Sequence, residues 1–356
     1  MHYLVTGGAG FIGRLLCTTL LARGDRVTVL DLAPLPPSRP GEPAPTRVVR
    51  GDVRDPAAVR EALAGCDAVF HLAAAHHDFG IDHATYFGVN EGGAEVLCAA
   101  MDAAGVRDVC FYSSVAVFGD APEPHHEDAP TAPNNDYGAS KLAGEAVFRR
   151  WAVAGPQRRV LVIRPTVTFG PGNFANMYSL IRQIDSGLFV RVGAGDNVKS
   201  LSYVENLVDA TLYLWDRPQA APFEAYHWVE KPDLTSAEIA ASISAALGRP
   251  TPRLRIPLGA ALALAAPFDA VIRLTGRNLP ISSARVRKLA ADRTKFEADR
   301  VRAAGFRPRV TLDEGIRRMV AWYRAEGSRL VPVRHLPPSE PVRTHTVQTP
   351  RARHAA

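Results

Sequence analysis

Residues 4–13 read LVTGGAGFIG, and this stretch decides the fold of the chain. A short apolar strand enters a glycine-rich turn, and an apolar-periodic helix begins at Phe11. Gly7 would let the backbone turn tightly, Gly10 would leave room for a pyrophosphate group, and Gly13 would let the helix pack closely on the strand. The helix N-terminus offers free N–H groups and the positive end of its dipole to such a group. The stretch therefore predicts a dinucleotide-binding α/β unit.

Asp31 indicates which dinucleotide binds. It ends a second apolar strand, residues 26–30, at the spacing beyond Gly13 that is typical of such units. A carboxylate at this place accepts hydrogen bonds from the two ribose hydroxyls of an adenosine and repels a 2′-phosphate. Because no Arg or Lys follows immediately, the sequence favours NAD over NADP.

Apolar strand patterns alternate with helical patterns through the first half of the chain. This alternation predicts a doubly wound parallel sheet with helices on both faces and ligands at the carboxyl ends of the strands. We expect strands at 2–6, 26–30, 46–50, 68–72, 108–112 and 159–164, and helices near 11–23, 56–64, 91–104 and 138–154.

The residues after each strand are therefore candidates for the binding site. Asp52 and Val53 follow the third strand, where the carboxylate would bind the adenine amino group and the valine would pack on the ring. The alternative for Asp52 is a turn or cap before the helix that starts at Pro56. Small residues at 72–75 would let the backbone pass beneath the cofactor, and Asn90 either contacts the cofactor or caps a helix.

Several histidines follow the fourth strand. His76, His77, Asp78 and His83 have a spacing that fits no standard metal site. We expect a solvated loop or substrate contacts there, and no metal.

A hydroxyl, a phenol and an amine form the candidate catalytic group. Ser114 follows the fifth strand, and Tyr137 and Lys141 are four residues apart, on one face of a predicted helix. A phenol with its ordinary pKa of about 10 is a poor base at neutral pH. A nearby ammonium group favours the phenolate, so Tyr137 could take a proton from a substrate hydroxyl while Ser114 holds the oxygen.

Taken together, these motifs resemble the extended short-chain dehydrogenases/reductases, in the NAD-dependent epimerase/dehydratase family of nucleotide-sugar enzymes. The resemblance covers about residues 1–328 and also includes VFG at 117–119 and the segment from Arg164 to Asn173. It implies a catalytic triad of Ser114, Tyr137 and Lys141. It also implies cofactor contacts from Gly7, Gly10, Phe11, Ile12, Asp31, Asp52, Val53, Leu72, Ala73, Ala74, Asn90, Tyr137, Lys141 and Pro165.

The resemblance extends to the substrate. Family members contact the nucleotide or diphosphate near Asn173, Asn176 and Lys199, and the residue after the catalytic hydroxyl, Val115, lies in the same cleft. The dehydratases of the family carry adjacent acidic residues where this chain has Val115 and Ala116. Dehydration by that mechanism is therefore not expected.

The remaining features concern domains and location. We expect a cofactor domain at 1–170 with a return segment at about 198–216, a mostly helical substrate lobe at 171–197 and 217–328, and a disordered tail at 329–356 rich in Pro, Arg and His. The apolar run 258–268 contains Pro267 and is too short to span a bilayer, so a surface or interface helix is expected.

Composition is that of an ordinary soluble protein, at 47% hydrophobic and 22% charged residues. The formal net charge of +6 owes much to the tail and gives no support to nucleic-acid binding. The sequence starts directly with a core strand, and no metal-like or disulfide-like spacing links Cys17, Cys66, Cys98 and Cys110. We expect a cytoplasmic homodimer.

Three functions fit these observations. The first is an NAD-dependent nucleotide-sugar epimerase, most simply one that inverts C4 of a UDP-hexose through a transient keto sugar. The second is a net oxidoreductase, either an NAD(P)-dependent keto-sugar reductase or an enzyme like the hydroxysteroid dehydrogenases. The third is a non-catalytic NAD sensor, against which the intact Ser114, Tyr137 and Lys141 count.

Overall fold

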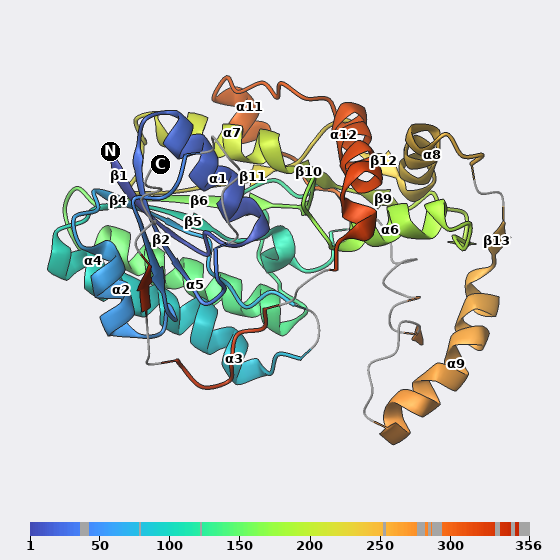
Figure 1. The fold of residues 1–356 in the computed structure, drawn as a ribbon, viewed down its shortest axis with the longest axis horizontal. Coiled ribbons are helices and arrows are strands. Elements are labelled where there is room, and N and C mark those ends of the chain that lie inside the picture. Colours follow the sequence, from blue (N-terminus) through green and yellow to red (C-terminus); the bar gives the residue numbers. More distant parts are fainter. Residues whose placement is uncertain are drawn as a thin grey trace, which may run out of the picture.

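The computed structural model describes residues 1–35, 43–77, 80–121, 123–251, 254–275, 282–283, 286, 294–331, 335–342 and 346–348. One sheet forms its centre, with strand order β11-β6-β5-β4-β1-β2-β3-β14 (Figure 1). All neighbours in it are parallel except β14, which runs antiparallel to β3. The strands are β1 (His2–Thr6), β2 (Arg26–Asp31), β3 (Arg47–Arg50), β4 (Ala68–His71), β5 (Asp108–Tyr112), β6 (Arg159–Pro165), β11 (Phe223–Trp228) and β14 (Thr346–Gln348). The six expected strands and the doubly wound fold are confirmed.

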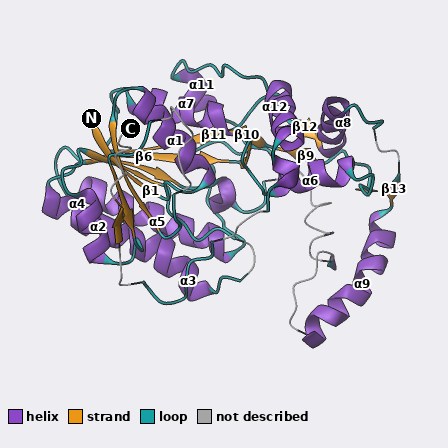
Figure 2. Cartoon of the chain, viewed as in Figure 1, coloured by secondary structure: helices purple, strands orange, loops and turns teal. Residues whose placement is uncertain are grey.

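Helices cover both faces of this sheet (Figure 2). On one face α1 (Phe11–Ala22) and α7 (Val204–Trp215) share a buried core with the strands. On the other face the core includes α2 (Pro56–Leu63), α4 (Gly93–Ala104) and α5 (Asp136–Val153). A short helix α3 (His83–Phe87) and one π-helical turn (Gly88–Gly92) lead into α4. Because both faces are covered, the strands are apolar along most of their length.

A smaller lobe lies beyond the carboxyl end of the sheet. Its core joins α6 (Asn176–Asp185), α8 (Ser236–Leu247) and α12 (Leu312–Ala325). Three two-stranded pairs accompany these helices: β7 (Val167–Phe169) with β10 (Leu201–Tyr203), β9 (Val198–Lys199) with β12 (Leu234–Thr235), and β8 (Arg191–Val192) with β13 (Arg255–Ile256). Helices α9 (Leu258–Thr275) and α11 (Asp299–Ala303) and 3₁₀ turns at Val115–Phe118 and Gly327–Arg329 complete the described elements.

The boundary between the two parts differs from the expectation. Residues 223–228 were assigned to the substrate lobe, but they form β11, which pairs in parallel with β6 at the edge of the main sheet. The segment is only partly covered, with Ala225, His227 and Trp228 buried and Phe223, Glu224 and Tyr226 partly exposed, as at a sheet edge. The cofactor domain therefore recruits a strand from beyond residue 217.

The tail is also better ordered than expected in the part that the structure describes. Residues 346–348 form β14 on the free edge of β3. The three backbone carbonyls of Pro338, Ser339 and Glu340 accept hydrogen bonds from the Arg54 guanidinium, at 2.8, 3.1 and 3.3 Å. Backbone pairing of this kind needs no apolar side chains, so composition alone did not predict it. Residues 332–334, 343–345 and 349–356 of the tail lie outside the described residues.

Helix α9 is longer than the apolar run predicted. It continues through Pro267 to Thr275, reaches 18 residues, and is the one described helix long and apolar enough to cross a membrane. Length and composition alone are weak support for a span, because core helices pass the same test. Yet only Ala261 and Ala265 of α9 are buried, so α9 is not a core helix.

Candidate active site

The glycine turn has the geometry that a dinucleotide needs. Gly7 has a φ of +71°, and a Cβ built on it would lie 2.6 Å from the backbone nitrogen of Ala73. A Cβ on Gly13 would lie 2.2 Å from the carbonyl oxygen of Gly7. A side chain at either position would therefore separate β1, β4 and α1. Gly10 caps α1 without any side-chain hydrogen bond, so the first N–H groups of this helix remain for a ligand.

Phe11 and Ile12 open α1 directly behind this turn. Both are partly exposed, and Ile12 packs on the core of that face. They therefore lie where their backbone N–H groups point out of the helix end.

Asp31 closes the other side of the turn. Its carboxylate accepts hydrogen bonds from the backbone N–H of Ala9 at 2.9 Å and of Ala33 at 2.8 Å. Burial raises the pKa of this carboxyl, while the two N–H donors and nearby His335 lower it. The bond to Ala9 fixes the carboxylate beside the glycine turn, where the sequence places an adenosine ribose.

Asp52 lies next to the tail. Its carboxylate is buried and receives Arg54, with Nη2 at 2.7 Å from Oδ2 and Nε at 3.0 Å from Oδ1. The backbone N–H of Val342 also donates to Oδ2 at 3.3 Å. Val53 is buried against Gly93 at the start of α4. The predicted adenine residue is thus already surrounded by donors from its own loop and from the tail, a contact that the sequence did not reveal.

The loop after β4 passes beneath the glycine turn. The N–H of Leu72 donates to the carbonyl of Thr6, and the N–H of Ala73 donates to its hydroxyl at 3.2 Å. Ala74 follows, partly exposed, on the same side. The loop therefore lies beside the glycine turn, as the sequence predicted.

Asn90 has a different set of contacts. It lies in the π-helical turn and is buried. Its amide exchanges two hydrogen bonds with the backbone of Ala75, at 2.9 and 3.0 Å, and donates to Ser140 at 2.9 Å. Asn90 therefore fixes the end of the β4 loop against α5, and any contribution to cofactor binding is through that loop.

Ser114 and Tyr137 lie on two elements in close contact. Ser114 caps the 3₁₀ turn by accepting a hydrogen bond from the N–H of Ala116 at 3.1 Å. A Cβ on Gly138 would lie 2.3 Å from the carbonyl oxygen of Ala116, so the glycine after Tyr137 allows α5 to touch this turn. Tyr137 is half-buried against the same core as Ala73. The structure thus packs the turn that starts at Ser114 against the first turn of α5, where Tyr137 lies.

Lys141 follows Tyr137 by one helical turn and is buried. Its ammonium lies 4.2 Å above the centre of the Phe111 ring. Burial lowers the pKa of Lys141 to about 7, and Glu145 opposes this change. Glu145 itself is held by Arg164 in a buried ion pair at 2.6 Å. Lys141 is therefore desolvated, with its ammonium over the Phe111 ring and one helical turn from Tyr137.

One residue near Lys141 was missed by the sequence analysis. His71, at the end of β4, stacks on Phe111 with ring centres 5.5 Å apart and hydrogen-bonds Thr6 at 2.7 Å. Burial and the charge of Lys141 lower the pKa of His71 to about 3, so it is neutral at ordinary pH. A polar residue at the end of an otherwise apolar strand was the available signal. His71 positions the β1 and β4 ends beneath the site.

The other histidines make no metal site among the described residues. His83 pairs with Asp136 at 3.0 Å, and the rings of His76 and His77 lie 4.3 Å apart. Asp78 lies outside the described residues. His83 is thus tied to the first turn of α5, directly before Tyr137.

The predicted substrate residues Asn173, Asn176 and Lys199 lie in the segments that follow β6, as does Pro165 of the predicted cofactor set at the end of that strand. Pro165 ends β6, and Asn173 is buried, with its side chain accepting the N–H of Ala175 at 2.7 Å. Asn176 is exposed at the start of α6. Lys199 lies on β9, where it pairs with β12 and bridges to Thr294. Val115 is partly exposed at the start of the 3₁₀ turn.

The chain therefore fits a dinucleotide cofactor. Gly7 and Gly13 form a cradle that side chains would fill, and the open end of α1 offers N–H donors for phosphate. Asp31 lies beside this turn, where it would bind the ribose. These residues would hold the phosphates and the adenosine ribose of the cofactor, which would supply hydride transfer.

The sheet order, the glycine turn and the Ser114, Tyr137 and Lys141 set together define an enzyme of the extended short-chain dehydrogenase/reductase class. The sequence model of the NAD dependent epimerase/dehydratase family matches residues 3–227. The chain belongs to this family, and it is an NAD-dependent enzyme.

Similar proteins support this assignment. The N-acetyl-α-D-glucosaminyl-diphospho-ditrans,octacis-undecaprenol 4-epimerase of Escherichia coli O157:H7 is 37% identical over 322 residues, covering 90% of this chain and 95% of that protein. The 2-alkyl-3-oxoalkanoate reductase of Stenotrophomonas maltophilia is 28% identical over 333 residues, covering 90% and 99%. The UDP-glucose 4-epimerase of Thermus thermophilus, solved with NAD, has the same fold at a TM-score of 0.72 and 24% identity, covering 92% of this chain and all of that one.

Proposed function

We propose that this enzyme inverts C4 of a hexose carried on a diphosphate, most simply a UDP-hexose, through a transient keto sugar. The observation that carries the proposal is the acid–base set itself. Ser114 starts a turn that packs against the beginning of α5, where Tyr137 lies, and this turn continues with Val115 and Ala116 instead of acidic residues. One hydroxyl and one phenol suffice for moving a proton on and off a single oxygen.

The roles of the residues follow from their positions. Tyr137 takes the proton of the C4 hydroxyl and later returns it, while Ser114 hydrogen-bonds the same oxygen. Lys141, buried one turn away, favours the phenolate when it is protonated. When bound, NAD supplies the hydride acceptor and donor for this carbon. In this proposal, Lys199 on β9 and Asn176 at the start of α6 bind the diphosphate and the group attached to it.

The test is isotopic. Catalytic amounts of NAD should support interconversion of UDP-glucose and UDP-galactose, or of their N-acetylamino forms, without accumulation of NADH. In heavy water, the hydrogen at the inverted carbon should be retained. Deuterium at that carbon would contradict the proposal. Stoichiometric NADH would instead favour a net oxidoreductase, the function of the 28% identical reductase.

A polyprenyl diphosphate is the second candidate for the carrier. It is favoured by the 37% identical relative, which is matched over 95% of its length and whose name specifies an undecaprenol diphosphate. Comparing kcat/KM for UDP-N-acetylglucosamine and for N-acetylglucosaminyl-diphospho-undecaprenol in detergent distinguishes the two carriers.

We also propose that the enzyme is a homodimer in the cytoplasm. All four cysteines are buried and free, as in proteins of a reducing compartment. Light scattering of the purified chain and fractionation of producing cells test these two points.

A further inference from the structure

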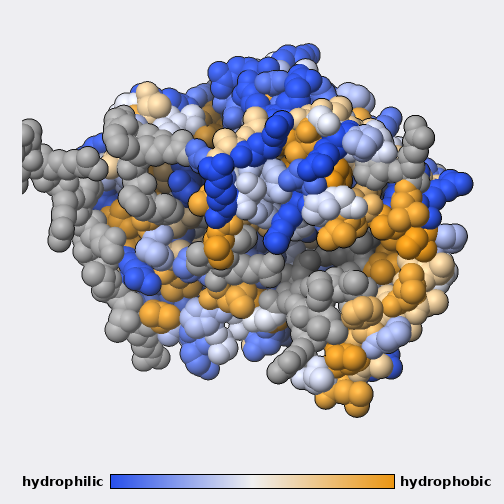
Figure 3. Space-filling view, turned by 45° about the vertical axis from the view of Figure 1, so that its right-hand side comes forward, coloured by the Kyte–Doolittle hydropathy of each residue, from blue (hydrophilic) through white to orange (hydrophobic). Residues whose placement is uncertain are grey.

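The most unusual surface of the described molecule is α9. Large apolar side chains are exposed along one side of it at helical spacing: Leu264, Phe268, Val271 and Leu274. Leu264 is 62% exposed and Leu274 is 87% exposed. Figure 3 shows apolar side chains gathered over this helix, which projects from the lobe. Continuous apolar surface of this kind marks an interaction site.

Neighbouring loops extend the same apolar surface. Leu188 follows α6, and Leu254 directly precedes β13, and both side chains are strongly exposed. The pairing of β8 with β13 brings these two loops to the base of α9. Exposed large apolar residues in the rest of the described chain are scattered.

The charge around α9 selects the partner. Residues 249–295 contain ten Arg or Lys and two Asp, in a chain whose formal net charge is only +6. Arg249, Arg255 and Arg273 within this range are exposed. A second copy of the same surface would be repelled by its like charge. An anionic lipid bilayer offers both an apolar interior and opposite charge, at roughly 1 kcal/mol for each basic residue near its surface.

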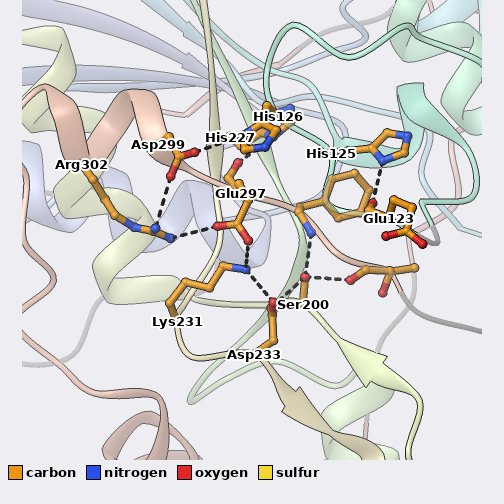
Figure 4. A network of polar contacts seen from close by, with 12 residues as sticks. Glu123, His125, His126, Ser200, His227, Lys231, Asp233, Glu297, Asp299 and Arg302 are labelled. Atoms are coloured by element: carbon orange, nitrogen blue, oxygen red, sulfur yellow. Dashed lines mark hydrogen bonds and ion pairs between the residues drawn. The ribbon is translucent and has the colours of Figure 1, made fainter.

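Both ends of the α9 excursion are fixed to the same lobe. Its start is held by β13, and the chain returns at Thr294, whose N–H donates to the carbonyl of Val198. Ser200 binds the Thr294 carbonyl, and Lys231 joins Asp233 to Glu297 a few residues further on (Figure 4). A spanning helix would require residues 276–293, with five Arg or Lys, to cross back through the lipid. A helix lying in the interface has no such requirement.

We propose that α9 docks this enzyme on the surface of an anionic bilayer, with Leu264, Phe268 and Val271 inserted among the lipids. Thr294, where the chain returns after α9, forms a β-bridge with Lys199. Docking would therefore bring Lys199, which we expect to bind the diphosphate, close to the membrane. The proposal does not depend on the reaction catalysed. It concerns the binding of lipid by the protein itself.

The experiment is sedimentation of the full chain with vesicles. Vesicles of equal parts phosphatidylcholine and phosphatidylglycerol should bind the wild type, and pure phosphatidylcholine vesicles should bind it much less. The combined substitutions Leu264→Gln, Phe268→Gln and Val271→Gln should weaken binding at least tenfold. Because these side chains are exposed, the circular dichroism melting curve should be unchanged. The matched control is Val153→Gln, a 72% exposed position at the end of α5, which should bind as the wild type does.

A second variant reports insertion directly. Tryptophan fluorescence of Val271→Trp should shift to the blue when anionic vesicles are added. Absence of wild-type binding, or undiminished binding by the triple variant, would overturn the proposal. The proposal would also fail if light scattering found the wild type dimeric and the triple variant monomeric, while the wild type did not bind vesicles. That result would mean that α9 is buried between two copies.

Discussion

Helices α1 and α9 are both apolar, but their surroundings are opposite. In α1, Gly13, Leu16, Cys17 and Leu20 are buried against the sheet and α7. In α9, only two alanines are buried, although the helix is half as long again. The apolar composition of a helix therefore indicates that it packs against an apolar surface. Whether this partner belongs to the same chain depends on the tertiary contacts, and in α1 the glycine turn brings the helix onto the sheet.

The comparison predicts that catalysis depends on the cofactor domain and is independent of α9. Tyr137→Phe removes only the titrating oxygen, and general acid–base catalysis by one group contributes about 10²–10⁴-fold. We expect kcat to fall by about a thousandfold while the Kd for NAD changes little, measured by turnover and by titration. The α9 triple variant should keep its turnover on a soluble UDP-sugar. Near-normal turnover of Tyr137→Phe would assign the base to another group, with His76 and His77 the first to test.

Stability should separate the two helices in the same way. Leu20→Ala in α1 removes a fully buried side chain and should lower the free energy of unfolding by about 2–5 kcal/mol. Leu264→Ala in α9 should change it by less than about 0.5 kcal/mol, since the side chain is largely exposed. Urea unfolding of both variants measures the difference. A large loss for Leu264→Ala would mean that α9 is covered by protein in solution.

Lys141 is expected to be required for activity and to lower the free energy of unfolding. Its pKa in the folded chain, about 7, lies below its ordinary value, so the unfolded chain binds more protons between pH 7 and the ordinary pKa. Lys141 therefore makes the free energy of unfolding rise with pH across that window. The full destabilisation by Lys141 is present at about pH 7 and below. Lys141→Met should stabilise the ligand-free protein by about 1–4 kcal/mol at pH 6, less at pH 9, while removing turnover. A variant less stable than the wild type at pH 6 would contradict the stated cause.

The next smaller effect is that of Asp31 on the preference for NAD over NADP. Asp31→Ala removes the charge that repels a 2′-phosphate, so the preference for NAD over NADP should narrow by about tenfold in Kd, roughly 1.4 kcal/mol. Asp25→Ala, which removes a carboxylate bound to the N-terminus away from the ribose site, is the control and should leave the ratio unchanged. Wild-type protein that binds NADP better than NAD would show that Asp31 does not read the ribose.

The sequence predicted those parts of the fold that carry a local signal. The strands β1 to β6 each have an apolar run and a following turn, and the Tyr137–Lys141 spacing places both residues on one face of a helix. Strand β11 was missed because Glu224 and His227 interrupt its apolar pattern at the sheet edge. The burial of Lys141 over Phe111 and the use of Asn90 to bind Ala75 depend on long-range contacts, which no spacing in the sequence encodes.

Removal of the tail is expected to have the smallest effect on stability. It tests contacts that the composition of the tail did not predict. Truncation after Val331 removes the pairing of β14 with β3 and the three carbonyl partners of Arg54, so Tm should fall by about 2–4 °C. NAD binding should move the other way. A carboxylate has about four acceptor positions, and those of Asp52 are already used by the backbone and side chain of Arg54 and by the N–H of Val342.

The adenine amino group can reach Asp52 only if one donor leaves, and the Val342 bond, at 3.3 Å, is the longest of them. Truncation should therefore tighten NAD binding about three- to tenfold, or up to roughly 1.4 kcal/mol. Val342→Pro removes this N–H but keeps the tail, so it should reproduce the tighter binding with little change in Tm. Weaker NAD binding in both variants would mean that the tail forms part of the adenine site and does not compete for it.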